Sequence, residues 1–327
     1  MSILITGGAG YIGSHIAHEL VDRGDDVVIL DNLSTGVREN VPAKAEFVQG
    51  NVGDRDTLSA LFKAHQIDAV MHFAGSIVVP ESVENPLKYY DNNTAVTRTL
   101  LEACVAEKID KFVFSSTAAV YGMPHADELP VTEKTPTVPI NPYGRSKLMT
   151  EWMLQDISYA HDFRYVALRY FNVAGADPSG RTGQSTPAAT HLIKVACQAA
   201  LGVREQLGVF GTDYETRDGT CVRDYIHVTD LAKVHLLALD ALQAGSPSRV
   251  LNCGYGRGFT VREVIDSVRR VSGVDFVTHD LERRAGDPPE LIANAGELRA
   301  QFNWQPEHDD LDHIVETALK WERRMMR

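Results

Sequence analysis

The stretch Thr6-Gly-Gly-Ala-Gly-Tyr-Ile-Gly13 decides the fold of this 327-residue chain, because it places a cluster of glycines between an apolar run and a helical pattern. Glycines in such a turn allow a tight bend, close backbone approach to a pyrophosphate, and close packing of the helix on the strand. The pyrophosphate then meets unpaired N–H groups and the positive end of the helix dipole. The sequence therefore predicts a dinucleotide site at the start of the chain.

An acidic residue ends the next apolar run. Asp31 follows Val27–Leu30, and a carboxylate at this place accepts hydrogen bonds from both hydroxyls of a ribose. The same carboxylate would repel a 2′-phosphate. The predicted cofactor is therefore NAD rather than NADP.

Apolar, β-rich runs alternate with helical patterns through the first half of the chain, which predicts parallel strands joined by crossover helices. Strands are expected at residues 2–6, 26–31, 45–49, 69–73, 111–116 and 165–169, and helices near 10–23, 55–65, 86–107 and 142–161. This order predicts an α/β fold with a Rossmann doubly wound parallel sheet.

The alternation of strand and helix patterns ends after Tyr170. Pro, Gly, Ser and Thr crowd residues 174–190, which predicts a long functional loop. A hairpin-like stretch is expected around 207–222, and helices near 190–201, 228–244, 261–271, 297–302 and 311–324. We expect an NAD-binding Rossmann domain in residues 1–170, with segments at about 223–255 partly returning to it. Residues 171–327 are expected to form a smaller, interwoven α/β substrate-binding domain.

Composition excludes several classes of protein. The formal net charge of −12 argues against a nucleic-acid partner, which normally requires a basic surface. No apolar run is long enough to span a membrane, and the first residues read as a strand rather than a signal peptide. Four cysteines without Cys-x-x-Cys spacing predict free thiols, no metal site and a cytoplasmic location.

A tyrosine and a lysine, Tyr143 and Lys147, lie four residues apart at the start of a predicted helix, which puts both on one face. A nearby ammonium favours the phenolate, so we expect a lowered pKa at Tyr143, as a general acid/base requires. The predicted strand 111–116 delivers Thr117 to the carboxyl edge of the sheet, where ligands bind. Its hydroxyl can hydrogen-bond a substrate hydroxyl that Tyr143 deprotonates.

With these residues in view, the chain resembles the extended short-chain dehydrogenase/reductases, and within them the UDP-glucose 4-epimerase family. The resemblance covers nearly the whole chain. It rests on TGGAGYIG (6–13), DNLSTG (31–36), HFAG (72–75), YYDNN (89–93), SSTAAVYG (115–122), NPYGRSK (141–147), LRYFNVAGADPSG (168–180), VFGTDYETRDGTCVRDYIHV (209–228) and RRAGD (283–287).

The resemblance implies reversible NAD-dependent 4-epimerisation of a UDP-hexose through a transient 4-keto sugar, with Tyr143, Lys147 and Thr117 as catalytic residues. The implied cofactor contacts are Gly7, Gly10, Tyr11, Ile12, Gly13, Asp31, Asn32, Ser34, Gly36, Asn51, Val52, Phe73, Ala74, Gly75, Asn92, Ser115, Tyr143, Lys147 and Tyr170. The implied substrate contacts are Thr117, Tyr143, Phe171, Asn172, His191, Leu192, Val209, Phe210, Arg223, Tyr225, Arg284, Asp287 and Leu291. Asn172, Arg223 and Arg284 would hold the diphosphate, a task that suits the planar fork of arginine.

Sister families sharpen the prediction. Related 4,6-dehydratases and UDP-glucuronate decarboxylases carry an acid shortly after the strand-end Ser/Thr, to drive further chemistry on the keto intermediate. This chain has Ala118 and Ala119 there, which transfer no protons. The resemblance therefore implies an epimerase.

Three positions depart from the commoner epimerase pattern. Asn51 stands where an Asp usually faces the adenine, and Ile77 stands where many relatives place a lysine near the nicotinamide ribose. The segment before Ile193 reads Thr-His-Leu, and it would contact the uridine side chiefly through its backbone, with His191 as a positioning residue. Leu291, of intermediate bulk, leaves UDP-GlcNAc and UDP-pentose 4-epimerases open as alternatives.

Two other interpretations remain. A one-way NAD-dependent nucleotide-sugar dehydrogenase or reductase would use the same Tyr, Lys and Thr. It would oxidise or reduce one molecule of cofactor for each sugar nucleotide converted. A nucleotide-sensing regulator that has lost catalysis need not keep those residues. For assembly, the apolar faces of residues 93–107 and 146–161, together with the resemblance, predict a homodimer through a four-helix interface.

Overall fold

The computed structural model describes residues 1–186, 189–284 and 286–326. Pro187 and Ala188 of the predicted loop 174–190, and Ala285 of the RRAGD motif, lie outside the described residues. The chain divides into two compact units, each built from three stretches. Unit 1 comprises Met1–Val120, Pro139–Arg169 and Ala232–Leu251, and unit 2 comprises Tyr121–Val138, Tyr170–Leu231 and Asn252–Arg327. The functional division at residue 170 stays a prediction.

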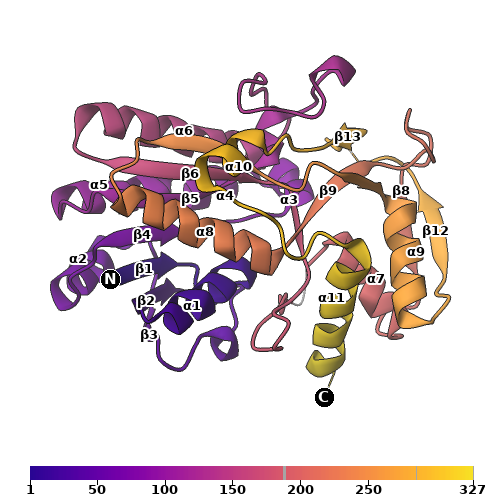
Figure 1. The fold of residues 1–327 in the computed structure, drawn as a ribbon, viewed down its shortest axis with the longest axis horizontal. Coiled ribbons are helices and arrows are strands. Elements are labelled where there is room, and N and C mark those ends of the chain that lie inside the picture. The colour runs from indigo at the N-terminus through magenta and orange to yellow at the C-terminus, as the bar shows by residue number, and fades with distance from the viewer. Residues whose placement is uncertain (187–188, 285, 327) are drawn as a thin grey trace. The chain divides into compact units, whose positions relative to one another are not determined.

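The largest sheet of the described residues has seven strands in the order β10-β6-β5-β4-β1-β2-β3, and Figure 1 labels β1 to β6 of it. Its strands are β1 (Ser2–Thr6), β2 (Asp26–Asp31), β3 (Glu46–Gln49), β4 (Ala69–His72), β5 (Lys111–Thr117), β6 (Arg164–Tyr170) and β10 (Arg249–Cys253). The pairs β1-β2, β1-β4, β2-β3 and β4-β5 are parallel. The order reverses between β1 and β4, as in a Rossmann sheet, and this confirms the predicted fold class.

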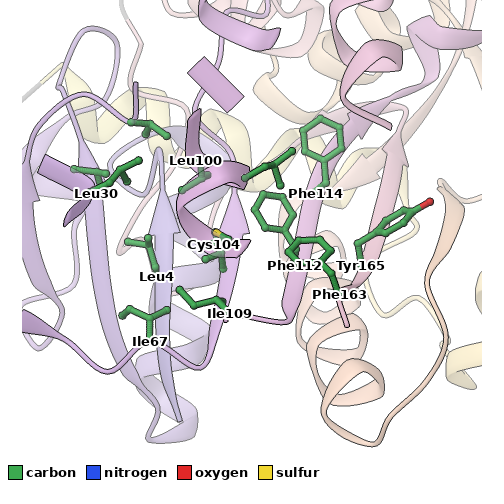
Figure 2. Close-up of a cluster of buried hydrophobic side chains, with 14 of the residues drawn as sticks. Leu4, Leu30, Ile67, Leu100, Cys104, Ile109, Phe112, Phe114, Phe163 and Tyr165 are labelled. Carbon is green, nitrogen blue, oxygen red and sulfur yellow. The ribbon is translucent and has the colours of Figure 1, made fainter. Parts of the chain in front are cut away.

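Helices follow the strands as crossovers. They are α1 (Tyr11–Arg23), α2 (Arg55–Ala64), α3 (Val79–Glu84), α4 (Pro86–Tyr89), α5 (Val96–Ala106), α6 (Pro142–Ala160) and α8 (Val228–Gln243). Leu4, Leu30, Phe112 and Phe114 on the strands share one buried cluster with residues of α2, α5 and α6 (Figure 2). Because the alternating residues Ile3, Ile5 and Ile29 are also buried, the sheet is covered on both faces.

The predicted single helix over 86–107 is wrong. The chain forms α4, then a π-helix at Tyr90–Ala95, then α5. The wider π turn goes with the burial of an asparagine: Asn93 Oδ1 accepts from the Ser76 N–H at 2.7 Å, and its Nδ2 donates to Ser146 Oγ at 3.0 Å. Its backbone carbonyl accepts the hydroxyl of Thr97 at 2.7 Å. Such π turns occur frequently at functional sites.

Unit 2 is built around a central strand. β9 (Val222–His227) pairs with β7 (Asn172–Ala174), β11 (Gly258–Thr260) and β13 (Glu290–Leu291). β8 (Leu207–Phe210) pairs in parallel with β12 (Thr278–Leu281). The helices are α7 (Leu192–Ala200), α9 (Val261–Ser272), α10 (Gly296–Phe302) and α11 (Leu311–Met325), of which α7, α9 and α11 pack together.

The hairpin predicted around 207–222 is therefore wrong. β8 finds its partner in β12, and β9 finds its partners in β7, β11 and β13, all of them distant in sequence. Strands of two to four residues carry too few alternations to reveal their partners. Within the described part of the chain, no helix combines the length and apolar character that crossing a membrane requires.

Candidate active site

The loop between β1 and α1 is shaped by its glycines. Gly7 has φ of 72°, and a Cβ added to it would lie 2.6 Å from the backbone nitrogen of Ala74. A Cβ on Gly13 would press into the carbonyl oxygen of Gly7. The N-cap of α1 is Gly10, and no side chain caps the first turn. The N–H groups of the first turn of α1 can therefore bind an anion, so this loop fits the pyrophosphate of NAD.

Asp31 is held at the end of β2 by the loops around it. Oδ2 accepts the N–H of Ala9 at 3.0 Å, and Oδ1 accepts the N–H of Leu33 at 2.8 Å. A Cβ on Gly36 would lie 2.9 Å from Oδ1, so glycine keeps space beside the carboxylate. The fixed acid at this strand end fits a ribose diol.

Most of the other predicted cofactor residues of unit 1 lie in the segments that follow the strands, and two lie in a strand and in the π-helix. Asn32 and Asn51 stabilise their own turns, accepting the N–H groups of Ser34 at 3.0 Å and Gly53 at 2.8 Å. The further members of this set are Val52 after β3, Phe73, Ala74 and Gly75 after β4, Asn92 in the π-helix, and Ser115 in β5. Tyr170 belongs to unit 2.

The predicted catalytic residues lie on β5 and α6. α6 begins after Asn141, whose Oδ1 accepts the N–H of Gly144 at 2.8 Å, and Pro142 occupies the first turn. Lys147 is buried, and its Nζ donates to the carbonyl of Ser115 at 2.8 Å. The hydroxyl of Tyr143 is hydrogen-bonded to Thr117. The structure thus brings Tyr143, Lys147 and Thr117 to the same end of β5.

Burial dominates the electrostatics of this group. It raises the pKa of Tyr143 above the usual value, and the hydrogen bond from Thr117 acts in the opposite direction. Burial also lowers the pKa of Lys147 to about 8. The pKa of Tyr143 is therefore raised rather than lowered as expected, because removing the phenol from water disfavours its charged form more strongly than the Thr117 hydrogen bond favours it.

The predicted diphosphate residues lie in unit 2. Arg223 on β9 stands in register with Leu291 on β13, and Asn172 on β7 stands in register with Tyr225 on β9. The Arg223 guanidinium lies 3.8 Å from Asp287 Oδ1. β9 therefore carries an arginine and a tyrosine of the predicted set, with Asn172 and Leu291 on the strands beside it.

Arg284 stacks over the ring of Phe210 at 3.6 Å from the ring centroid. Burial lowers the pKa of this guanidinium, and Asp287 acts in the opposite direction. Arg223 and Arg284 both interact electrostatically with Asp287. The two guanidinium groups therefore lie near the same carboxylate in unit 2. Val209, beside Phe210 on β8, is buried.

The remaining predicted substrate residues are His191 and Leu192, at the start of α7, and Phe171, which precedes β7. Leu192 begins α7, and His191 is its N-cap without a side-chain cap bond. Burial lowers the pKa of His191, helped by the charge of Lys194, and this favours the neutral imidazole. Phe171, between β6 and β7, donates its N–H to the carbonyl of Cys253 at 3.3 Å.

Comparison with known proteins identifies the family. Residues 3–254 match the model of the NAD dependent epimerase/dehydratase family. The chain belongs to this family. A UDP-glucose 4-epimerase from Azospirillum brasilense is 60% identical over 323 residues, covering 99% of this chain and 92% of the relative.

Two solved structures of family relatives match this fold. A crystal structure of UDP-glucose 4-epimerase from Brucella ovis in complex with NAD has a TM-score of 0.94 and 45% identity, covering 98% of this chain and 97% of that one. The UDP-Glc/GlcNAc 4-epimerase from Campylobacter jejuni has a TM-score of 0.85 and 48% identity, covering 99% of each chain. Membership of the epimerase family confirms the resemblance and NAD as the cofactor, whereas the roles of individual residues stay predictions.

Sequence reasoning missed several buried charges close to predicted site residues. Asp224, between Arg223 and Tyr225, accepts backbone N–H groups from Tyr255 at 2.9 Å, Gly256 at 2.8 Å and Ala293 at 3.2 Å. Glu151 on α6 and Arg169 on β6 form a buried ion pair. The available signal was a charged residue inside an otherwise apolar strand, as in LRYF and VRDYIHV.

Gly144, beside Tyr143, gives a direct test of how closely α6 must approach β5. A Cβ there would lie 2.5 Å from the carbonyl oxygen of Ala119. We expect Gly144→Ala to push the start of α6 away from β5 and lower kcat by ~10-fold or more, since misplacement by about 1 Å costs up to ~10²-fold. Kinetics with UDP-galactose check this, with Arg145→Ala in the same turn as the matched control. Full activity in Gly144→Ala would show that this close approach is dispensable.

Proposed function

We propose that this chain catalyses the reversible NAD-dependent 4-epimerisation of a UDP-hexose, interconverting UDP-glucose and UDP-galactose through a transient 4-keto sugar. The observation that carries the proposal is the 60% identity to a UDP-glucose 4-epimerase across 99% of this chain. The arrangement of Tyr143, Lys147 and Thr117 supplies the acid/base chemistry that such a reaction needs.

In this mechanism Tyr143 moves the proton of the sugar 4-hydroxyl. Thr117, hydrogen-bonded to the phenol, orients that hydroxyl, and Lys147 places a positive charge on the same face of α6. Bound NAD would supply the hydride acceptor for C4 and the hydride donor for the other face of the keto sugar, and its positive ring would favour the phenolate of Tyr143. Tyr143 then returns its proton to the sugar oxygen, so no net oxidation results.

Unit 2 provides the groups that would hold the nucleotide. Arg223 and Arg284 present planar forks that suit the diphosphate, with Asp287 helping to orient both. Fixing the diphosphate leaves the sugar free to rotate about its link to the phosphate, which epimerisation requires. Tight binding through the nucleotide also keeps the reactive ketone from escaping.

The residues after Thr117 favour epimerisation over elimination or decarboxylation. Ala118 and Ala119 begin a short 3-10 helix directly after β5. Methyl side chains there can neither donate nor accept a proton, so no group at these two positions drives further chemistry on the keto sugar. We therefore propose that the ketone is only formed and reduced again.

The test is to incubate the purified protein with UDP-galactose, with and without added NAD, and to separate the sugar nucleotides by chromatography. UDP-glucose accumulating to equilibrium without net NADH supports the proposal. NADH produced in proportion to the sugar consumed would instead establish a one-way dehydrogenase. No reaction with this substrate, followed by turnover of UDP-GlcNAc or a UDP-pentose, would reassign the sugar.

UDP-GlcNAc is a second candidate substrate. The Campylobacter jejuni relative, 48% identical, acts on both UDP-Glc and UDP-GlcNAc according to its name. Leu291 is buried on β13, opposite Arg223, where its bulk would limit the space for an N-acetyl group. The ratio of kcat/KM for UDP-galactose and UDP-GalNAc measures whether this candidate applies.

We also propose that the enzyme is a cytoplasmic homodimer. α5 and α6 contact each other in unit 1, and α6 presents Trp152 at 54% and Tyr159 at 80% exposure. Large apolar side chains exposed on one helix suit a two-fold, four-helix interface. All four cysteines are free and buried, which suits a reducing compartment. A stable monomer in a sizing measurement would refute the dimer.

A further inference from the structure

A buried ion pair joins the helix and the strands next to the predicted catalytic residues. Glu151 on α6 receives two hydrogen bonds from Arg169 on β6, Nε to Oε1 at 3.0 Å and Nη2 to Oε2 at 2.6 Å. The side chains are 5% and 7% exposed. Ser116 on β5, also buried, donates its hydroxyl to Oε1 of the same glutamate. One carboxylate thus connects three elements.

The spacing along α6 links this pair to the reaction. Tyr143, Lys147 and Glu151 are four residues apart in succession, so they lie on one face of the helix. Each contacts β5: the Tyr143 hydroxyl bonds Thr117, Lys147 Nζ bonds the Ser115 carbonyl, and Glu151 bonds Ser116. Three consecutive residues of one strand therefore meet three successive turns of one helix.

The contact made by Glu151 is ionic and hydrogen-bonded, unlike an apolar packing contact. Apolar side chains at these positions would stabilise the packing of α6 on the sheet at least as well, because burying two charges carries a large desolvation free energy. A two-pronged Arg–carboxylate pair instead fixes both distance and direction. It also adds no net charge beside the phenol and the ammonium. The pair fixes α6 against β6, and the Ser116 hydrogen bond to the same carboxylate fixes α6 against β5.

We propose that Glu151, Arg169 and Ser116 form a positioning group that sets the placement of Tyr143 and Lys147 relative to Thr117. The inference rests on the proposed epimerase function. The three residues make no contact with the reacting sugar in this role, and they act only through the catalytic residues. A purely structural role would alter stability without altering the chemistry, and the two roles are separable by experiment.

The first variant is Ser116→Ala, which leaves the ion pair intact and removes its bond to β5. We expect kcat for UDP-galactose to fall ~10-fold with KM unchanged, and Glu151→Gln to lower kcat on the order of 10²-fold. The acid limb of the pH–rate profile should also move to higher pH. The reason is that the Thr117 hydrogen bond holds down the pKa of Tyr143, and loosening α6 weakens that bond.

The matched control lies on the same two strands at their other end. Asp110, before β5, bonds Arg164 at the start of β6 at 2.9 Å and Lys111 at 2.6 Å. Asp110→Asn should lower the melting temperature while leaving kcat and the pH–rate profile as in the wild type. This control separates the loss of a strand-to-strand ion pair from the loss of catalytic register.

Glu151→Gln leaves a buried arginine without its partner and can prevent folding. The double variant Glu151→Gln/Arg169→Met removes both charges and should fold, yet we expect its kcat to stay low. Wild-type kcat and pH profile in Ser116→Ala and in the double variant would overturn the positioning role. Failure of the wild-type protein to epimerise any UDP-sugar would instead overturn the proposed function, so the two failures are distinguishable.

Discussion

Tyr143→Phe is expected to lower kcat for UDP-galactose epimerisation by a factor on the order of 10²–10⁴, the usual contribution of a general acid/base. The change removes only the phenol oxygen. The ring keeps its edge-on packing against Tyr89, with centroids 6.4 Å apart, so the fold and the binding of UDP should be preserved. Steady-state kinetics together with calorimetric titration of UDP would measure both.

A matched control is Tyr121→Phe, which removes another buried phenol oxygen, bonded to Asn252 Oδ1 at 2.6 Å. It should lose stability without losing turnover. Tyr143→Phe with wild-type kcat would contradict the assigned role of Tyr143. Loss of UDP binding in step with kcat would show that the variant had disturbed the fold rather than the chemistry.

Lys147→Met is expected to lower kcat by on the order of 10²-fold, because methionine fills the same buried space without the charge that favours the phenolate. Burial lowers the pKa of Lys147 to about 8. Its ammonium therefore loses its proton as pH rises through that value, and wild-type kcat should fall on the alkaline side.

Lys147→Arg tests the origin of that alkaline limb, since a guanidinium keeps its charge at any working pH. We expect lower activity at neutral pH, because the planar fork cannot reproduce the bond to Ser115. The fall above about pH 8 should disappear. A pH–rate profile of both proteins decides the matter, and an identical alkaline limb in the variant would assign that limb to another group.

The parallel sheet was predictable because its strands are continuous apolar runs between turn residues. The predicted bounds 2–6 and 26–31 coincide with β1 and β2. The π-helix was not predictable, since apolar periodicity through residues 86–107 does not reveal that Asn93 turns inward to bond Ser76 and Ser146. The pairing of β8 with β12 depends on contacts between segments far apart in sequence, which short strands do not encode locally.

The candidate site shows the same limit. The spacing of Tyr143 and Lys147, with Thr117 at a strand end, suffices to place the three on neighbouring elements. The raised pKa of Tyr143 was not predictable, because it follows from how completely the folded protein removes the phenol from water. Arg169 and Glu151 are 18 residues apart, and only the packing of α6 on β6 reveals that each neutralises the other.

The assembly of each compact unit from three separated stretches bears on how the protein forms during synthesis. Unit 1 needs residues up to Leu251, and unit 2 needs the chain to its last helix. A ribosome adds roughly 5–20 residues per second. The chain between the end of β6 and the start of β10 therefore takes several seconds to synthesise, and β1 to β6 are present without β10 during that time. During that interval the edge of the nascent sheet at β6 lacks its final partner, and it is the place where chaperone binding or misassociation would begin.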